Sequence, residues 1–217
     1  MKYRIALLAV SLLAIVSCSI TGHDPDSFAA WHARHHDEAE GLTQYLAERD
    51  LAGVLPIHEL LRSASSWQQC NAEPFAVPPR QQWESVASVL TLLKHLVSSG
   101  VVGSNIEVYS GYRNPDLNAC AGGAKASAHA TSFALDIKVS GSADTASALC
   151  DFWRSEGEAW NMGFSIYPSG RIHIDTAGYR TWGYDHTGKS AACPATRTTG
   201  KRPDSPGSAG IAILAEK

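Results

Sequence analysis

The sequence has no apolar run long enough to cross a lipid bilayer as a helix. Its longest such run, residues 5–16, counts twelve residues and is interrupted only by Ser11. A hydrocarbon core of about 30 Å needs roughly 20 residues at about 1.5 Å of rise each. Because Lys2 and Arg4 precede the run, we interpret residues 1–17 as a secretory signal peptide.

The end of this signal resembles a bacterial lipobox, in which small and branched residues precede a cysteine. The segment runs from Leu13 to Cys18. The resemblance implies cleavage before Cys18 and acylation of that residue, which would make outer-membrane lipid a partner of the chain. Ser19 follows in place of an acidic residue, which favours transfer to the outer membrane. We expect an exported, periplasm-facing lipoprotein, with an ordinary cleaved signal peptide as the alternative.

The sequence also lacks an excess of basic charge. It has 18 Lys and Arg against 21 Asp and Glu, a net charge of −3. Loss of Lys2 and Arg4 with the signal peptide lowers the basic count to 16 and the net charge to −5. Nucleic-acid-binding domains carry a strongly basic face, so nucleic acid is not an expected partner.

No two cysteines have the Cys-x-x-Cys spacing of a zinc site. Beyond Cys18 the chain has Cys70, Cys120, Cys150 and Cys193. This is an even number in a protein expected to reach an oxidising compartment, where disulfides form. Four cysteines allow three pairings and the sequence does not choose among them; we favour Cys70 with Cys120 and Cys150 with Cys193.

The far end of the chain, residues 195–217, lacks aromatic side chains and is rich in Gly, Ser, Pro, Thr and Ala. This composition is typical of disordered tails. Before it we expect a tether and helical segment over residues 18–55 and one folded domain over residues 56–194. A chain of this length buries a sizeable core without help from a metal.

Three segments, residues 25–49, 82–99 and 143–156, repeat their apolar side chains at the three- and four-residue spacing of a helix. The second has the most regular stripe, so it should pack on a core. In the first, three histidines share a helical face but no carboxylate or cysteine completes a metal site. We interpret these histidines as a solvated polar face: His32, His35 and His36.

Alternation of apolar and polar side chains predicts strands at residues 106–109 and 134–139 and a hairpin over residues 164–175, with Pro168 and Gly170 in its turn. Two of these strands bury an aliphatic face and present metal-binding groups on the other. The predicted fold class is α+β: a small, mainly antiparallel sheet that bears a zinc site and is flanked by helices, with an N-terminal helical extension.

Three residues of these segments form a candidate metal site. His129 and Asp136 lie seven positions apart, and His173 comes from the returning strand of the hairpin. Two imidazoles and a carboxylate are a ligand set for catalytic zinc, which keeps one coordination position open for water. Taken alone, Asp136 could pair with Lys138 or Arg113, and His173 could be a satisfied core histidine. Together the three residues predict a zinc site.

The surroundings of this set resemble the zinc D-Ala-D-Ala carboxypeptidases and related murein endopeptidases. Ser127-x-His129-x6-Asp136 looks like their S-x-H-x-x-G-x-A-x-D signature, and residues 110–115 resemble the S-G-Y-R-x-P segment that precedes it. Residues 166–183 are similar to the closing segment of the endopeptidase branch. Three motifs in the right order make the pattern specific.

The resemblance covers about residues 57–185. It assigns zinc binding to His129, Asp136 and His173 and substrate binding to Arg113. An arginine in that role would grip a substrate carboxylate or carbonyl through a permanently charged, bidentate guanidinium. Ser127 would bind the substrate or support the zinc-binding residues. Zinc would lower the pKa of its bound water towards about 7.

Two positions depart from the family pattern. The glycine of the signature is Ser132, which implies a turn that tolerates a side chain. Gly170 stands where many carboxypeptidases of the family have the Glu or Asp that deprotonates the zinc-bound water. Asp175 is the nearest substitute, either as the catalytic base or as a hydrogen-bond acceptor for a zinc-bound histidine. His186 is a third candidate for the base.

We therefore expect zinc-dependent hydrolysis of peptide bonds in peptidoglycan stem peptides, at a terminal D-Ala-D-Ala or at a cross-link. Zinc is the expected cofactor and peptidoglycan peptides are the expected partner. The missing base motivates an alternative, a non-catalytic zinc-containing lipoprotein that binds peptidoglycan. A structural lipoprotein without metal is a third hypothesis.

Overall fold

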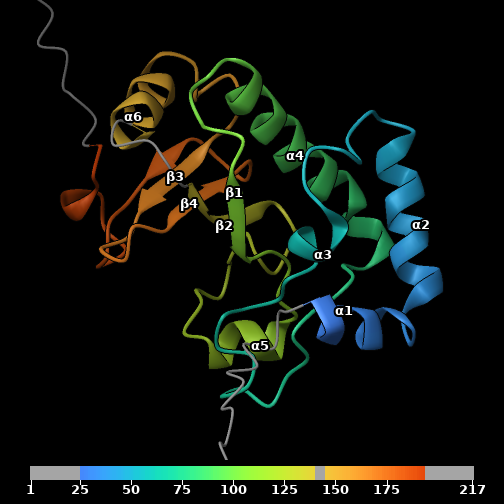
Figure 1. Ribbon diagram of the computed structural model, residues 1–217. Coiled ribbons are helices and arrows are strands. Elements are labelled where there is room, and N and C mark those ends of the chain that lie inside the picture. The colour runs from blue at the N-terminus through green and yellow to red at the C-terminus, as the bar shows by residue number, and fades with distance from the viewer. Residues whose placement is uncertain (1–24, 140–144, 194–217) are drawn as a thin grey trace, which may run out of the picture.

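The computed structural model describes residues 25–139 and 145–193 (Figure 1). The expected signal peptide, the expected acylation site Cys18 and the expected tail lie outside these residues. A five-stranded sheet has the order β1-β2-β4-β3-β5, in which only β3 and β5 pair in parallel. The predicted α+β class with a mainly antiparallel sheet is confirmed. The strands are β1 (Ile106–Ser110), β2 (Ala134–Val139), β3 (Gly163–Ile166), β4 (Ile172–Asp175) and β5 (Arg180–Thr181).

The register between β2 and β4 decides which side chains meet at the centre of the sheet. Asp136 lies opposite His173, and Leu135 lies opposite Ile174. Because successive residues of a strand face opposite sides, the carboxylate and the imidazole share one face while the two aliphatic side chains share the other. A slip of one residue would separate the polar pair.

Helices cover the aliphatic side of the sheet and extend away from it. Figure 1 places α4 between the sheet and α2, and α4 contacts both β2 and α2. Within the described residues, no helix is long and apolar enough to cross a membrane. The helices are α1 (Pro25–His32), α2 (His36–Ala47), α3 (Ile57–Leu60), α4 (Trp83–Ser98), α5 (Pro115–Cys120) and α6 (Thr145–Ser155), with 3₁₀ turns η1 (Arg80–Gln82) and η2 (Gly188–Ser190).

The predicted stripe of α4 has five residues, of which four are buried and the last is partly buried against the core: Val86, Val89, Leu90, Leu93 and Val97. Leu92 and Leu96, which lie outside the stripe, are also fully buried. The helix is buried over more of its circumference than the stripe indicates because the sheet lies on one side of it and α2 on the other.

The helix predicted over residues 25–49 is two helices, which is a correction to the sequence analysis. The chain breaks between α1 and α2, where Trp31 stacks on His35 with ring centroids 4.5 Å apart. Trp31, Leu42 and Leu46 are all buried in the main core. At about 100° per residue, these three positions would also lie within about 60° of one another on a single straight helix. Their spacing therefore gave no sign of the break.

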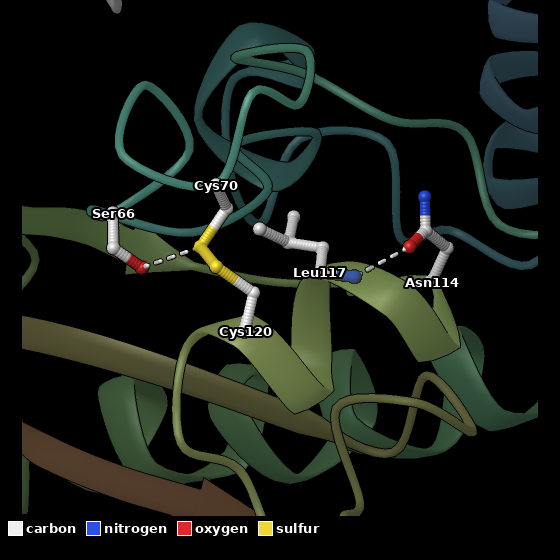
Figure 2. The surroundings of a disulfide bond; sticks show 5 residues. All are labelled: Ser66, Cys70, Asn114, Leu117 and Cys120. Carbon is white, nitrogen blue, oxygen red and sulfur yellow. Dashed lines mark hydrogen bonds between the residues drawn. A yellow bond between two sulfur atoms is a disulfide. The ribbon is translucent and has the colours of Figure 1, made fainter.

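Both disulfides have the favoured pairing, Cys70 with Cys120 and Cys150 with Cys193. Figure 2 shows the first one, which joins the end of α5 to the loop that carries Cys70. Helices α3 and α5 and strand β5 were not predicted from the sequence. The start of α5 is nevertheless well marked, because Asn114 caps it by accepting a hydrogen bond from the Leu117 amide at 2.8 Å (Figure 2).

Candidate metal centre

Three side chains converge on the polar face of the sheet. His129, Asp136 and His173 each offer one ligand atom, and these atoms all lie within 4.8 Å of one another. Asp136 comes from β2 and His173 from β4, while His129 comes from the loop before β2. That loop is fixed by the Arg113 amide, which donates to the His129 carbonyl at 3.1 Å. The structure thus brings together the three residues predicted to bind zinc.

Both imidazoles are oriented by a partner on their outer nitrogen. His129 Nδ1 lies 2.8 Å from the Gly111 carbonyl oxygen, and His173 Nε2 lies 2.8 Å from Asp175 Oδ2. The inner nitrogens therefore face Asp136 Oδ1, at 3.2 Å from His129 Nε2 and 2.9 Å from His173 Nδ1. Metal-binding histidines usually have such an outer acceptor. This donor set fits a divalent transition metal such as zinc.

The electrostatics of the cluster keep the carboxylate ionised. Burial raises the pKa of Asp136, but its interactions with His129 and His173 outweigh burial and hold that pKa well below the usual carboxyl value. Burial lowers the pKa of His129 although Asp136 opposes this, and Arg113 lowers it further. Burial lowers the pKa of His173, but the hydrogen bonds that its ring makes to the carboxylates of Asp136 and Asp175 outweigh burial and raise that pKa. A negative charge is thus available for a cation.

Asp175 is inaccessible to solvent and has all its hydrogen-bonding positions in use. Its oxygens accept from Arg180 Nη1 and Nη2 at 2.8 and 2.7 Å and from the Ala177 amide at 2.8 Å, in addition to the contact with His173. A catalytic base needs a free lone pair within reach of the attacking water. Of the two roles predicted for Asp175, the geometry favours the acceptor that orients His173.

The backbone of β3 makes room for this buried carboxylate. A Cβ atom at Gly163 would lie 2.2 Å from Asp175 Oδ2, which is far inside van der Waals contact. Any side chain at Gly163 would therefore displace Asp175 and, with it, the His173 ring.

Arg113 lies at the edge of the cluster. Its Nη2 donates to Asp136 Oδ2 at 2.7 Å and its Nε donates to Ser110 Oγ at 2.7 Å. The ion pair with Asp136 that the sequence allowed is therefore present, and the guanidinium also lines the cavity above the cluster. Ser127 lines the same cavity and accepts a hydrogen bond from the His129 amide at 3.3 Å.

A cavity of about 520 Å³ opens over the three ligand residues. Its walls are the loop at residues 64–66, the loop at residues 121–128, the turn of the β3–β4 hairpin and the segment from β5 to Gly188. Among the described residues that line it, Asp136 is the only carboxylate, whereas three guanidinium groups are present. These belong to Arg113, Arg171 and Arg180.

The two departures from the family signature have simple backbone explanations. Ser132 has φ +62°, in the left-handed region that favours glycine, and its hydroxyl donates to Gln82 Oε1 at 2.7 Å. Gly170 has φ +78° in the hairpin turn, where its amide donates to the Tyr167 carbonyl at 2.9 Å. An acidic side chain at that position would carry backbone strain in this turn. His186 is exposed on a loop that lines the cavity.

Two residues of the site were not singled out from the sequence. Arg180 pairs with Asp175, and Trp182 packs edge-on against the His173 ring with centroids 5.0 Å apart. The segment containing Trp182 was part of the family resemblance, but nothing in the local spacing connects Arg180 to a buried carboxylate five residues earlier. That pairing depends on the parallel contact of β5 with β3.

Comparison with known proteins agrees with this geometry. Residues 55–175 match the family model described as Peptidase M15, which is more than half of the chain and includes all three ligand residues. A search of curated proteins and a search of solved structures each give no match. The chain therefore belongs to the peptidase M15 family, which includes the zinc D-Ala-D-Ala carboxypeptidases.

Proposed function

We propose that this M15 metallopeptidase is a zinc enzyme that hydrolyses peptide bonds in peptidoglycan stem peptides. The observation that carries the proposal is the convergence of His129, Asp136 and His173 on the floor of the cavity. A zinc ion held by these residues would acidify a bound water and polarise the peptide carbonyl. The cavity volume lies within the range of about 300–1,000 Å³ that is usual for small-molecule sites, which suits a few residues of a peptide.

The described side chains support this chemistry by position and charge. Asp175 holds the His173 ring through Nε2, and the edge-on contact with Trp182 limits its rotation. Arg113 holds Asp136 from the other side and faces the cavity. The cationic lining favours an anionic substrate, and stem peptides carry several carboxylates.

One observation favours a second candidate function, a metal-containing protein that binds peptidoglycan without cleaving it. Asp136 is the only carboxylate among the described residues of the cavity lining, and the oxygens of Asp175 are already engaged. Gly170 offers no side chain. His186 is the lining imidazole that does not belong to the ligand set, so proton transfer in the enzyme would fall to His186 or to a residue brought in with the substrate.

Purified peptidoglycan distinguishes the two functions. We expect the zinc-loaded protein to release D-alanine or to cleave cross-linked dimers, detected by liquid chromatography and mass spectrometry, and His173→Ala to abolish the product. His36→Ala is the matched control, because that side chain is 62% exposed and lies outside the site. Binding of peptidoglycan by the zinc-loaded wild type without any product would establish the second candidate instead.

The proposed location is the periplasmic side of the outer membrane, through acylation of Cys18. Metabolic labelling with an alkyne fatty acid should mark the wild-type chain and should leave Cys18→Ala unlabelled. Labelling that persists in Cys18→Ala would contradict the lipobox interpretation.

A further inference from the structure

Arg171 differs from the other two guanidinium groups of the cavity. Arg113 is paired with Asp136 and Arg180 with Asp175, each at 2.7 Å. No Asp or Glu of residues 25–139 and 145–193 forms an ion pair with Arg171, although its side chain lines the cavity. It is therefore the cation of the cavity lining that has no acidic partner in this part of the chain.

The Arg171 side chain is held in place by neutral groups. Its Nη1 lies 3.3 Å from Ser65 Oγ, on a loop 106 residues earlier, and its Nε lies 3.4 Å from Ser169 Oγ. Its Cζ lies 5.9 Å from the ring centroids of both Tyr109 and Tyr167. These contacts fix the direction of the guanidinium without neutralising its charge, so the cost of ordering it for a ligand is low.

The position of Arg171 relates it directly to the metal site. It lies just before β4 and two residues before His173, about 7 Å away along an extended backbone, and both side chains line the cavity. That distance is about two residues of an extended peptide. A carboxylate bound by Arg171 would therefore belong to a residue within about two positions of the bond at the metal site.

We propose that Arg171 determines specificity by binding a carboxylate of the substrate next to the scissile bond. The proposal rests on the proposed function and deepens it, because it defines the substrate class as peptides with a free carboxylate close to the cleaved bond. A guanidinium binds a carboxylate through two parallel hydrogen bonds. In a stem peptide this group is either the C-terminal carboxylate or the side-chain carboxylate of a diamino dicarboxylic acid.

Three synthetic stem peptides test the proposal. One has both carboxylates free, one has the C-terminal carboxylate amidated, and one has the side-chain carboxylate amidated. On the free peptide we expect Arg171→Gln to lower kcat/KM by roughly 10- to 100-fold, mainly through KM. Arg171→Lys keeps the charge without the bidentate geometry, so its kcat/KM should lie between those of the wild type and Arg171→Gln.

Amidation shows which carboxylate Arg171 binds. On the peptide that lacks the recognised carboxylate, the wild type should fall to the level of Arg171→Gln and the two proteins should be equal. On the other amidated peptide the difference between them should persist. Arg34→Gln is the matched control, because this arginine is 59% exposed and lies away from the cavity. Zinc content and circular dichroism of each variant report its folding.

The proposal would be overturned by an Arg171→Gln variant that matches the wild type on the free peptide, or that loses the same factor on all three peptides. The proposed function fails separately, if the zinc-loaded wild type cleaves none of the peptides. In that event calorimetry gives the dissociation constants of the same peptides. The role of Arg171 then requires that Arg171→Gln bind the free peptide more weakly than the wild type does, and that the two proteins bind one of the amidated peptides equally.

Discussion

The two oxygens of Asp136 serve different partners. Oδ1 faces both imidazoles, at 2.9 Å from His173 Nδ1 and 3.2 Å from His129 Nε2, while Oδ2 accepts from Arg113 at 2.7 Å. Arg113 is therefore coupled to the metal site as well as to the cavity. Replacing Arg113 should disturb metal binding in addition to substrate binding, so its effect alone does not identify a substrate-binding residue.

Asp175 predicts a pH-dependent contribution to the stability of the metal-free protein. Burial raises the pKa of Asp175, but His173 and Arg180 lower it more, so that it lies below the usual carboxyl value. A lowered carboxyl pKa stabilises the folded state above the unfolded pKa of about 4, and this stabilisation is lost as the pH falls through the folded pKa. At pH 7 we expect Asp175→Asn to lower the free energy of unfolding by about 3 kcal/mol.

Urea unfolding of the metal-free wild type and of Asp175→Asn at pH 7, 5 and 3 measures this contribution. The difference between the two proteins should grow from pH 7 to pH 5, because Asp175 also raises the pKa of His173 and the Asn variant loses this stabilisation. It should then shrink at pH 3, where Asp175 itself becomes protonated. A difference that does not change with pH would contradict the assigned ion pair with Arg180.

Ser132 combines an unfavourable backbone conformation with a favourable hydrogen bond. Ser132→Ala keeps φ +62° and loses the hydrogen bond to Gln82, so we expect it to lower the free energy of unfolding by about 1 kcal/mol. Ser132→Gly also loses the bond but relieves the left-handed strain, and it should be about 1 kcal/mol more stable than the alanine variant. Urea unfolding checks both values. An alanine variant as stable as the glycine variant would show that the turn is not strained.

The candidate metal-binding residues were predictable because their chemistry is carried by spacing along the chain. His129 and Asp136 belong to one short motif, and His173 alternates with aliphatic residues on a strand. The groups that orient these side chains were harder to predict from the sequence. The acceptor for His129 is the backbone carbonyl of Gly111, and any residue type provides a carbonyl, so its role is decided by the fold alone.

Elements with a regular hydrophobic period were predicted and short ones were not. The β3–β4 hairpin was predicted from alternation and from its turn residues, and α4 was predicted within one residue at each end. α5 has six residues, too few to repeat a helical period, although Asn114 followed by Pro115 is a typical helix start that could have revealed it. β5 has two residues, and its pairing with β3 depends on tertiary contact.

The disulfide between Cys70 and Cys120 joins two walls of the cavity. Ser65 and Ser66 precede Cys70 in one wall, and the loop at residues 121–128 follows Cys120 in the other. The bond closes a loop of 50 residues. In the chain-entropy description, its removal destabilises the protein by about 4 kcal/mol.

We therefore expect Cys70→Ser/Cys120→Ser to lower the free energy of unfolding by about that amount, and to reduce peptide binding because the two cavity walls separate. Cys150→Ser/Cys193→Ser is the comparison, since that disulfide closes a loop of similar length, 43 residues, between residues that do not line the cavity. It should lower stability comparably with a smaller effect on binding. Equal effects of the two double variants on binding would contradict a specific role for the first disulfide.

At the level of the whole molecule, one core contains segments from both sides of the predicted boundary between the N-terminal extension and the domain. Trp31, Leu42 and Leu46 from the predicted extension pack in the same cluster as Leu135 and Ile174 of the sheet. Local patterns identified each segment as helix or strand, but which segments share a core depends on contacts between residues far apart in the chain. The boundary near residue 55 therefore stays a prediction.

The most direct test is the zinc content of the purified protein after dialysis against buffer with trace zinc. We predict one zinc per chain for the wild type and for the control His36→Ala, and no stoichiometric zinc for His129→Ala, which should keep its secondary structure because the core does not depend on metal. Zinc at one per chain in a folded His129→Ala variant, or its absence from the wild type, would contradict the metal site on which the proposed peptidase activity depends.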